Sequence, residues 1–284
     1  MTKHFTDLTS ASILADSISP AGYRITTLRV TFPRFVLPEF NTHRAFSRSF
    51  RSSRAVPTKV LLEEVRSNPV IPCEFGLNRP GMQASDNMVG CELEQAKFFW
   101  VKAAREAADR AEELAALHVH KQVTNRLIEP FLWVHGVVTA TEWNNFFRLR
   151  CHNDAQPEFR ALAIAMRTAI EESTPEQKYY GEWHVPFIRE EDKRDMLNFE
   201  DILNISAARC ARVSYKPFGS NSYSTISDDL DLVQKLMGSD PKHFSPFEHQ
   251  ARVPEEGYDY LMFANLEGWA SRRTVIEYPK IAGE

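Results

Sequence analysis

The sequence has 284 residues, of which 43% are hydrophobic and 25% are charged, a balance that supports a packed core and excludes wholesale disorder. Its formal net charge of −4 excludes a generic polyanion binder, so any anion-binding site must be local. No apolar run approaches the roughly 18 residues that a membrane span needs, and residues 1–17 contain no hydrophobic signal core. We therefore expect a soluble, cytoplasmic protein without a membrane partner.

The N-terminal part of the chain predicts a strand, a polar segment and a loop. Residues 23–35 mix β-branched and apolar residues in partial alternation, and Pro33 near their end indicates a strand that leaves its sheet there. Residues 41–57 follow with a dense run of arginine and serine. Residues 68–90 are rich in proline and glycine, which is typical of a connecting loop.

The rest of the chain favours helices. Apolar residues recur at steps of three and four between Cys91 and Leu127, which predicts a long amphipathic helix. Residues 131–143 are compatible with a buried strand or with a helix, because periodicity alone does not separate the two. Helices are also expected at residues 156–173, where Pro157 suits the first turn, and at residues 199–215 and 227–240.

Metal and thiol chemistry find little support in the sequence. His118 and His120 are two residues apart, so on a helix they point to different faces, and we expect no metal site. Cys73 has the chemistry of a nucleophile, but no partner base lies near it in the sequence, which favours an ordinary small residue. The four cysteines form no C-x-x-C pair, which favours reduced thiols: Cys73, Cys91, Cys151 and Cys210.

The segment from residue 41 to residue 57, NTHRAFSRSFRSSRAVP, concentrates positive charge and hydroxyl groups. Its arginines, spaced by four, three and three residues, share one face of a helix or crowd one small surface of a loop: Arg44, Arg48, Arg51 and Arg54. Before Glu63, only Glu39 lies near enough in sequence to neutralise them. A solvated basic face and a phosphate cradle both explain this pattern, and the interleaved serine hydroxyls suit a nucleotide or a phosphorylated cofactor.

Two further polar patches are weak signals by themselves. Residues 144–159 place Arg148 and Arg150 before a helix start, where helix capping by Asp154 or Gln156 is the simpler explanation. Residues 243–250, HFSPFEHQ, gather histidine, glutamate and serine around a proline, as an ordinary polar turn also does. The dinucleotide-binding, P-loop and nucleophile-elbow motifs are absent from the sequence.

Taken together, four elements resemble the signatures of the flavin-dependent thymidylate synthases. The R-H-R element, its seven-residue spacer and its serine correspond to residues 42–52, with Arg54 two residues further on. The N-x-x-x-L-R element corresponds to residues 145–159, A-R-V-S-Y to residues 211–215 and H-x-S-P-F-E-H to residues 243–249. In the usual members the last two elements precede R-H-R, whereas here they follow it. The chain thus resembles the circularly permuted, phage-encoded members, and permutation is tolerated when the chain termini lie close together.

The resemblance implies an α+β fold, with a central, mainly antiparallel sheet flanked by helices. We expect one catalytic domain over residues 1–284, with an R-H-R-like half at residues 20–173 and a second half at residues 195–284. The family resemblance also implies a homotetramer whose active sites are shared between subunits.

The implied reaction is the reductive methylation of dUMP to dTMP, with FAD as the redox cofactor, methylenetetrahydrofolate as the one-carbon donor and NADPH as the reductant. Arg44, Ser52 and Arg150 are the expected catalytic residues. Arg150 would stabilise negative charge on the uracil ring when hydride attacks C6, so no enzyme nucleophile is needed. The resemblance places at the flavin His43, Arg44, Ala45, Asn145, Ser214, Ser245 and Glu248. It places at the nucleotide Glu39, Ser52, Ser53, Arg54, Arg126 and Arg150.

Several positions depart from the family pattern. Thr42 replaces the first arginine of R-H-R, the pair Ser49-Phe50 replaces Asn-Glu, and Glu39 and Asp154 replace a glutamine and a histidine. If Phe50 lies beside the base, we expect a drier pocket and a methyl product. If Phe50 only fills space, water would reach the activated methylene group and give a hydroxymethyl product.

Two alternatives to the lead function follow. One is flavin- and folate-dependent hydroxymethylation of a pyrimidine deoxynucleotide, dUMP or dCMP. The other is a non-enzymatic nucleic-acid-binding protein. We expect no nucleic-acid partner, because cradle arginines committed to FAD and a mononucleotide leave little exposed positive surface on an acidic chain.

Overall fold

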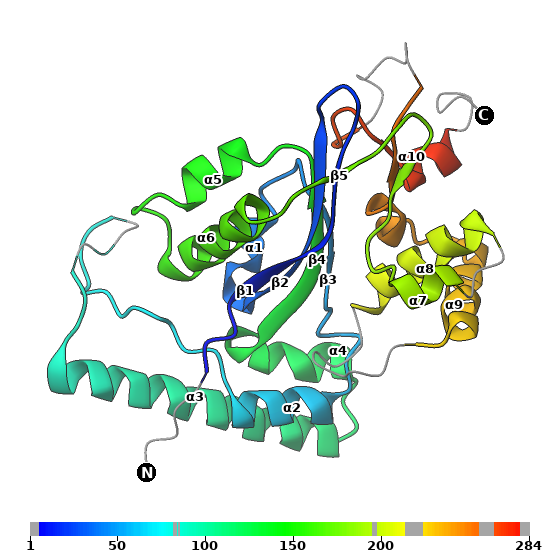
Figure 1. The fold of residues 1–284 in the computed structure, drawn as a ribbon. Coiled ribbons are helices and arrows are strands. Elements are labelled where there is room, and N and C mark those ends of the chain that lie inside the picture. Colours follow the sequence, from blue (N-terminus) through cyan, green and yellow to red (C-terminus); the bar gives the residue numbers. More distant parts are fainter. Residues whose placement is uncertain are drawn as a thin grey trace.

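The computed structural model describes residues 6–81, 84, 86–194, 198–213, 224–255 and 264–278 (Figure 1). Within these residues the chain forms a five-stranded sheet of order β3-β4-β2-β1-β5 and a three-stranded sheet of order β6-β7-β8. The large sheet contains β1 (Ser10–Ile18), β2 (Arg24–Pro33), β3 (Ser47–Phe50), β4 (Trp133–Ala140) and β5 (Glu176–Gln177). The small sheet contains β6 (Trp183–His184), β7 (Ala251–Arg252) and β8 (Ala270–Ser271).

The large sheet is antiparallel except at one edge. Strand β2 pairs antiparallel with β1 and with β4, and β3 pairs antiparallel with β4. Only β5, two residues long, runs parallel to its neighbour β1. The central strands β2 and β4 are rich in β-branched and apolar residues, and almost all of their side chains are buried, as suits the middle of a sheet. The predicted α+β fold with a mainly antiparallel sheet is confirmed.

Two helices cover one face of the large sheet. These are α5 (Asn144–Arg150) and α6 (Pro157–Glu171), with the 3-10 helix η1 (Arg34–Val36) and α1 (Leu37–Phe40) nearby (Figure 1). Strand alternation sends every second side chain of β2 toward this layer. The resulting core includes these fully buried residues: Leu28, Val30, Phe32, Phe40, Phe159, Leu162 and Met166.

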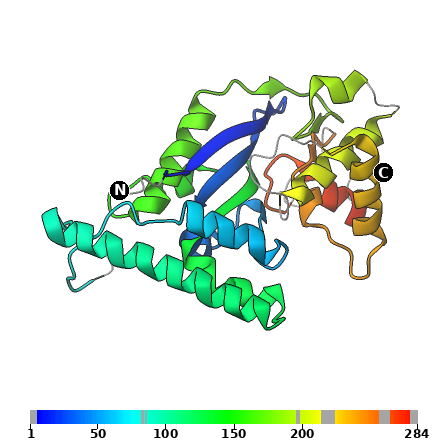
Figure 2. The ribbon, with the colours of Figure 1, turned by 90° about the horizontal axis from the view of Figure 1, so that it is seen from below.

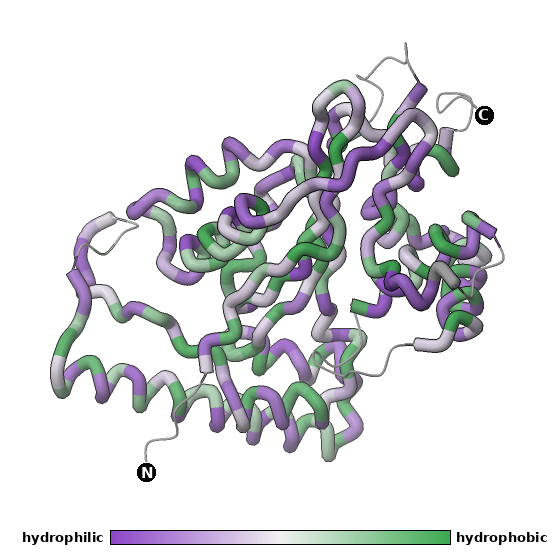
Figure 3. Tube along the Cα trace, in the orientation of Figure 1, coloured by the Kyte–Doolittle hydropathy of each residue, from purple (hydrophilic) through white to green (hydrophobic). Residues whose placement is uncertain are grey.

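A second core holds a separate group of helices. It contains α2 (Thr58–Ser67), α3 (Gly90–Ala116), α4 (Lys121–Thr124) and the 3-10 helix η2 (Asn125–Phe131). Helix α3 runs for 27 residues along α2, and hydrophilic and hydrophobic residues alternate along it (Figures 1, 2 and 3). The fully buried Ala104, Ala108 and Ala111 recur at helical spacing and pack against the apolar stripe of α2.

The C-terminal helices gather on the opposite side of the large sheet from α5 and α6 (Figures 1 and 2). They are α7 (Glu190–Arg194), α8 (Phe199–Arg212), α9 (Ile226–Gly238), the 3-10 helix η3 (Ser245–Glu248) and α10 (Arg272–Glu277). Buried Ala207 and Ala208 of α8, Val233 of α9 and Phe247 of η3 share a small core. This arrangement brings η3 to the polar face of the large sheet.

The predicted elements agree with the structure in most places. The strand predicted over residues 23–35 is β2, and α6 and α9 lie where helices were predicted. Residues 131–143, for which a strand and a helix were both possible, contain the strand β4. The helix predicted up to Leu127 ends instead at Ala116, because His118 adopts a left-handed φ of 61° that interrupts it. The helix predicted over residues 199–215 is observed to Arg212, and residues 214 and 215 lie outside the described part.

Across the described ranges, none of the helices combines the length and the apolar character required to cross a membrane.

Candidate active site

The arginine-rich segment is not a helix. Its middle is the edge strand β3, whose alternation sends the buried Ser47 and Ser49 to one face of the sheet and Arg48 to the other. Arg51 is buried and donates from both Nη atoms to the Glu64 carboxylate, at 3.0 and 2.8 Å. The remaining arginines of the segment, Arg44 and Arg54, are exposed. The four arginines therefore occupy different surroundings and do not share one face.

His43, Arg48 and Arg150 form a polar corner, called here the arginine–histidine corner. The Arg150 Nε donates to His43 Nε2 at 3.0 Å, and the Arg150 guanidinium lies over the ring of Phe159, 4.6 Å from its centroid. Arg48 Nη1 donates to the backbone carbonyls of Asn41 and His43, at 3.0 and 2.9 Å. The corner thus joins the turn before β3, the strand β3 and the end of α5.

The electrostatics of the arginine–histidine corner favour a bound anion. Burial, with the nearby charges of Arg150 and Arg48, lowers the pKa of His43 to about 4, so this ring is neutral and accepts at Nε2. Burial also lowers the pKa of Arg48 and of Arg150, and the charges of Glu248 and Glu39 oppose this only in part. Neither arginine donates a hydrogen bond to a carboxylate among the described residues. Partly desolvated cations that are short of counter-charge suit a negatively charged ligand.

The segment around η3 reaches the same strand from the far end of the chain. His249 Nε2 and Ser49 Oγ are 2.9 Å apart and fully or nearly fully buried, although 200 positions separate them in sequence. Asn265 Nδ2 donates to the carbonyl of Ala45 at 3.2 Å and to the hydroxyl of Ser47 at 3.0 Å. Two of the sequence elements that carry the family resemblance therefore meet in space.

A chain of hydrogen bonds continues from this contact across four strands of the large sheet. Each of its six side chains is at most 7% exposed. The successive distances are 2.9, 2.9, 2.7, 2.7 and 2.9 Å along Ser49, His249, Thr139, Thr27, His184 and Ser17. We call this series the buried polar chain.

The buried polar chain has only two complete arrangements of protons. Burial lowers the pKa of His184 and of His249 to about 3, so each ring is neutral and has one donor and one acceptor nitrogen. Each hydroxyl donates a single proton, so the direction of the Thr139–Thr27 bond fixes the direction of every other bond. As a result, both histidines carry their proton on Nδ1 or both carry it on Nε2.

A second cluster of charged groups lies where the loop after β3 contacts η2. Glu129 Oε1 accepts hydrogen bonds from Ser53 Oγ, from Arg126 Nη1 at 2.8 Å and from Arg34 Nη2 at 3.0 Å. Arg34 Nη1 donates to the backbone carbonyl of Arg51 at 3.4 Å. We call Glu129 and its three donors the Glu129 cluster. Ser53 and Arg126, both expected at the nucleotide, belong to it.

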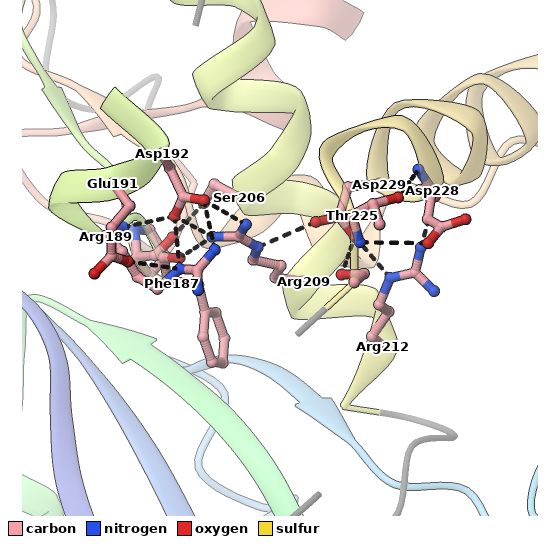
Figure 4. A network of polar contacts seen from close by, with 12 residues as sticks. Phe187, Arg189, Glu191, Asp192, Ser206, Arg209, Arg212, Thr225, Asp228 and Asp229 are labelled. Atoms are coloured by element: carbon pink, nitrogen blue, oxygen red, sulfur yellow. Dashed lines mark hydrogen bonds and ion pairs between the residues drawn. The ribbon is translucent and has the colours of Figure 1, made fainter. Parts of the chain in front are cut away.

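The arginine of the A-R-V-S-Y element has a structural role. Arg212 Nε donates to the fully buried Asp229 at 2.7 Å, and Arg209 Nε donates to the same carboxylate at 3.1 Å (Figure 4). Arg209 also donates to Asp192. Burial would raise the pKa of Asp192, but hydrogen bonds from Arg209 and Arg189 outweigh it and hold that pKa below its usual range. These ion pairs tie α8 to α7 and α9.

The other residues expected at the site are spread over its surroundings. Asn145 is exposed on α5, Ser245 is exposed at the start of η3, and Glu39 is exposed on α1. The side chain of Ser52 is half-buried. Glu248 forms an ion pair with Arg273 Nη1 at 2.6 Å, and Glu277 shares the same guanidinium through Nε at 2.9 Å. Ser214 lies outside the described residues.

Phe50 packs in the core on the α6 side of the sheet. Its ring meets those of Phe32 and Phe40 edge to face, with centroids 5.6 and 5.3 Å apart. It also lies against Gly136 of β4, where an added Cβ would come within 2.0 Å of the Phe50 ring. These contacts favour the second of the two roles considered for Phe50, a space-filling one, over a role in drying the pocket beside a base.

Sequence reasoning missed several polar residues that the fold brings to this region. Glu129, Asn265, Thr27, Thr139 and His184 belong to none of the recognised elements. A pattern in the sequence could have identified Thr27 and Thr139, because a hydroxyl at a central position of a buried strand must find a polar partner. Glu129 and Asn265 carry no such signal.

The mainly antiparallel α+β fold thus carries a partly desolvated cationic corner that suits an anionic ligand. The family model described as Thymidylate synthase complementing protein matches residues 15–176, more than half of the chain. The chain belongs to this family and is a thymidylate synthase-like enzyme. The family is flavin-dependent, which supports a flavin cofactor in general terms. The matched residues contain the R-H-R-like and N-x-x-x-L-R-like elements, and the other two elements follow them in sequence.

Solved structures show a similar fold. A UMP/dUMP methylase PolB from Streptomyces cacaoi, bound with 5-Br UMP, has a TM-score of 0.50 at 15% identity, with 58% of this chain and 90% of that chain covered. The same enzyme bound with 5-Br dUMP has a TM-score of 0.43 at 18% identity, with 52% of this chain covered. The chain covers 66% of that second structure, slightly less than two thirds of its length. At 15% identity, the likeness to the first of these structures shows the fold alone. A search of curated proteins found no match.

Proposed function

We propose that this enzyme catalyses the reductive methylation of dUMP to dTMP, with FAD as redox cofactor, methylenetetrahydrofolate as one-carbon donor and NADPH as reductant. One observation carries the proposal: the contact between Ser49 and His249, at 2.9 Å, unites the R-H-R-like segment with the S-P-F-E-H element. The resemblance expects both elements at a flavin. The nearby arginine–histidine corner adds the cations that an anionic cofactor or substrate needs.

The donor groups in and around the arginine–histidine corner fit FAD. A pyrophosphate needs hydrogen-bond donors and few competing carboxylates. The side chains of Arg44, Asn145 and Ser245 are exposed and have no hydrogen-bond or ion-pair partner in the described part of the chain. The carboxylate of Glu248 is already paired with Arg273. We propose that these donors, with His43 and the backbone at Ala45, hold FAD, which supplies hydride transfer when bound.

Arg150 is proposed to serve the nucleotide. Its Nε is held by the neutral His43 and its plane rests on Phe159, so the guanidinium is oriented while its two Nη atoms have no partner in the described residues. Such a fixed cation can stabilise negative charge that develops on a uracil ring. The position of His43 makes it the residue that orients Arg150.

The loop after β3 is proposed to bind the nucleotide phosphate. Arg54 is exposed there, beside Ser52 and Ser53, and Arg126 approaches from η2. Guanidinium and hydroxyl groups together suit a phosphate dianion. Ser52 and Arg44 keep the catalytic roles that the resemblance implies.

Cysteine nucleophiles are poorly placed for this reaction. Burial and the Glu158 carboxylate raise the pKa of Cys73 to about 12, and burial raises the pKa of Cys151 and of Cys210. These three thiols are therefore protonated and weak nucleophiles at neutral pH. This agrees with attack on the uracil ring by hydride rather than by an enzyme thiolate.

A second candidate is hydroxymethylation of dUMP or dCMP on the same scaffold. The packing of Phe50 against Phe32 and Phe40 favours it, because a ring in the core does not exclude water from a bound base. Both candidates share FAD, folate and a pyrimidine nucleotide, and they differ in whether the one-carbon unit is reduced or hydrated.

We further propose that residues 1–284 form one catalytic domain of permuted order that assembles as a cytoplasmic homotetramer with shared sites. The buried contact of Ser49 with His249 supports a single domain, because it joins the two halves of the chain. The net charge of −4 supports the absence of a nucleic-acid partner.

Flavin binding tests the proposal without requiring turnover. Protein reconstituted with FAD should show the visible absorbance of bound flavin and saturable binding in a titration. Arg44→Ala should weaken FAD binding, whereas Arg105→Ala, a matched change of an exposed arginine on α3, should not. Absence of any flavin band and of any measurable FAD affinity would remove the basis of the proposed function.

A further inference from the structure

The Glu129 cluster presents an arrangement that phosphate sites share. Two guanidinium groups and one hydroxyl, from Arg34, Arg126 and Ser53, converge on a single oxygen, Glu129 Oε1. The carboxylate is only 22% exposed, so these interactions are partly shielded from water. A phosphate oxygen accepts hydrogen bonds from the same kinds of donor.

Positive charge exceeds negative charge around this oxygen. Arg34, Arg51 and Arg126 lie together, and the charges of Arg126 and Arg51 add to burial in lowering the pKa of Arg34. In the described part of the chain, the carboxylates that bond to these arginines are Glu129 and Glu64, and Arg51 binds Glu64 with both Nη atoms. Three cations face two carboxylates, which leaves an excess that a phosphate dianion would satisfy.

A buried donor without a partner within the described ranges lies next to the Glu129 cluster, on Arg51, whose backbone carbonyl accepts from Arg34. Arg51 is 4% exposed, and its Nε has no hydrogen-bond partner in the described residues although it is buried. A buried donor without a partner is costly, and such groups often mark a place where a ligand or water binds. In the part of the chain that the structure describes, an unsatisfied buried donor therefore lies on the residue that contacts Arg34, one of the donors of Glu129.

We propose that Glu129 is an internal stand-in for the phosphate of the nucleotide. The inference rests on the proposed function, which assigns Ser53 and Arg126 to the nucleotide phosphate. Without nucleotide, the Glu129 carboxylate keeps Ser53, Arg34 and Arg126 in place and balances their charge. When a nucleotide binds, its phosphate takes over these donors and the Glu129 side chain turns toward solvent. Glu129 thereby lowers the affinity for phosphorylated ligands and keeps the site ordered while it is empty.

The test uses binding, so it does not depend on FAD or turnover. Glu129→Gln has nearly the same shape but no charge, and it should bind dUMP about tenfold more tightly than the wild type, because a weaker competitor is displaced. Inorganic phosphate should raise the melting temperature of Glu129→Gln more than that of the wild type. Deoxyuridine, which has no phosphate, should bind both proteins equally. Glu63→Gln, a matched change of an exposed glutamate on α2, should leave all three measurements unchanged.

A second variant covers the case in which Glu129→Gln does not fold. Glu129→Asp keeps the charge but shortens the side chain by one methylene group, so its carboxylate should hold the donors less well and give an intermediate gain in dUMP affinity. Unchanged or weaker dUMP binding in these variants, with an unchanged response to inorganic phosphate, would overturn the inference.

The two proposals can fail separately. If wild-type protein binds FAD and converts dUMP while the Glu129 variants bind nucleotide no better, only the inference about Glu129 is wrong. If phosphate stabilises Glu129→Gln strongly while no variant binds FAD or converts dUMP, the proposed function is wrong and the inference about Glu129 stands.

Discussion

Mild acid should unfold this protein, because three buried histidines must then take up protons. Burial lowers the pKa of His135, His184 and His249 to about 3 each, against an ordinary value of 6.5. Between these values the unfolded chain binds more protons than the folded one, so stability is complete above pH 6.5 and is lost as the pH falls.

The size of the effect depends little on the folded-state pKa values. At about pH 5, each unfolded histidine has gained roughly 2 kcal/mol from protonation that the folded state does not share, provided that the folded pKa stays below about 4. Three such histidines remove roughly 6 kcal/mol, which is comparable to the whole stability of a typical domain, about 5–15 kcal/mol. The predicted slope is therefore roughly 3 kcal/mol per pH unit near pH 6 and roughly 4 kcal/mol per pH unit near pH 5.

Urea unfolding followed by far-UV circular dichroism measures this slope directly. The free energy of unfolding, determined at several values between about pH 7.5 and about pH 5, should fall steeply below pH 6.5. His152→Gln, a change at an exposed histidine, should leave the slope intact. Replacement of His184 should reduce the slope by the contribution of one of the three buried histidines. A free energy of unfolding that stays constant from about pH 7.5 to about pH 5 would refute the reasoning.

Three further changes probe the site and its supports. Arg150→Ala should leave FAD binding intact but weaken dUMP binding by roughly 1.5–3 kcal/mol and slow turnover, as measured by titration and steady-state kinetics; unchanged dUMP affinity would contradict its assignment. In the wild type, ¹⁵N NMR should find the same tautomer in His184 and His249, and Thr27→Val should remove that correlation; opposite tautomers in the wild type would show that the buried polar chain is not continuous. Asp229→Asn should lower the free energy of unfolding by about 3–5 kcal/mol in urea titrations, because it leaves Arg212 without its carboxylate and removes one of the two that bind Arg209, and a loss below about 1 kcal/mol would show that these ion pairs are not structural.

Local patterns predicted the elements that the sequence punctuates clearly. The strand β2 ends at Pro33 and α6 begins at Pro157, because proline restricts the backbone at both places. The strand β1 was missed, since SASILADSI mixes small polar residues with apolar ones and gives no clear alternation. The end of α3 was also missed, because the left-handed backbone of His118 has no signal in a residue that is neither glycine nor asparagine.

The candidate site was accessible from the sequence only through family resemblance. Spacing alone does not predict that Ser49 and His249 lie 2.9 Å apart, because 200 positions separate them. Of the two conformations weighed for the arginine segment, a helix and a loop, the helix is wrong, since pairing of β3 with β4 determines the conformation of its middle. The role of Glu129 depends on a contact between a loop and η2 that no local pattern encodes.

The reaction itself is tested most directly by the mass of the product. Purified protein reconstituted with FAD is incubated with dUMP, methylenetetrahydrofolate and NADPH, and the nucleotide is analysed by mass spectrometry. The proposed function predicts a product heavier than dUMP by one CH₂ group, which is dTMP, and no product when FAD is left out. A product that carries one additional oxygen would contradict reductive methylation and identify the enzyme as a hydroxymethylase. Unchanged dUMP under conditions in which FAD is bound would contradict the assignment of dUMP as the substrate.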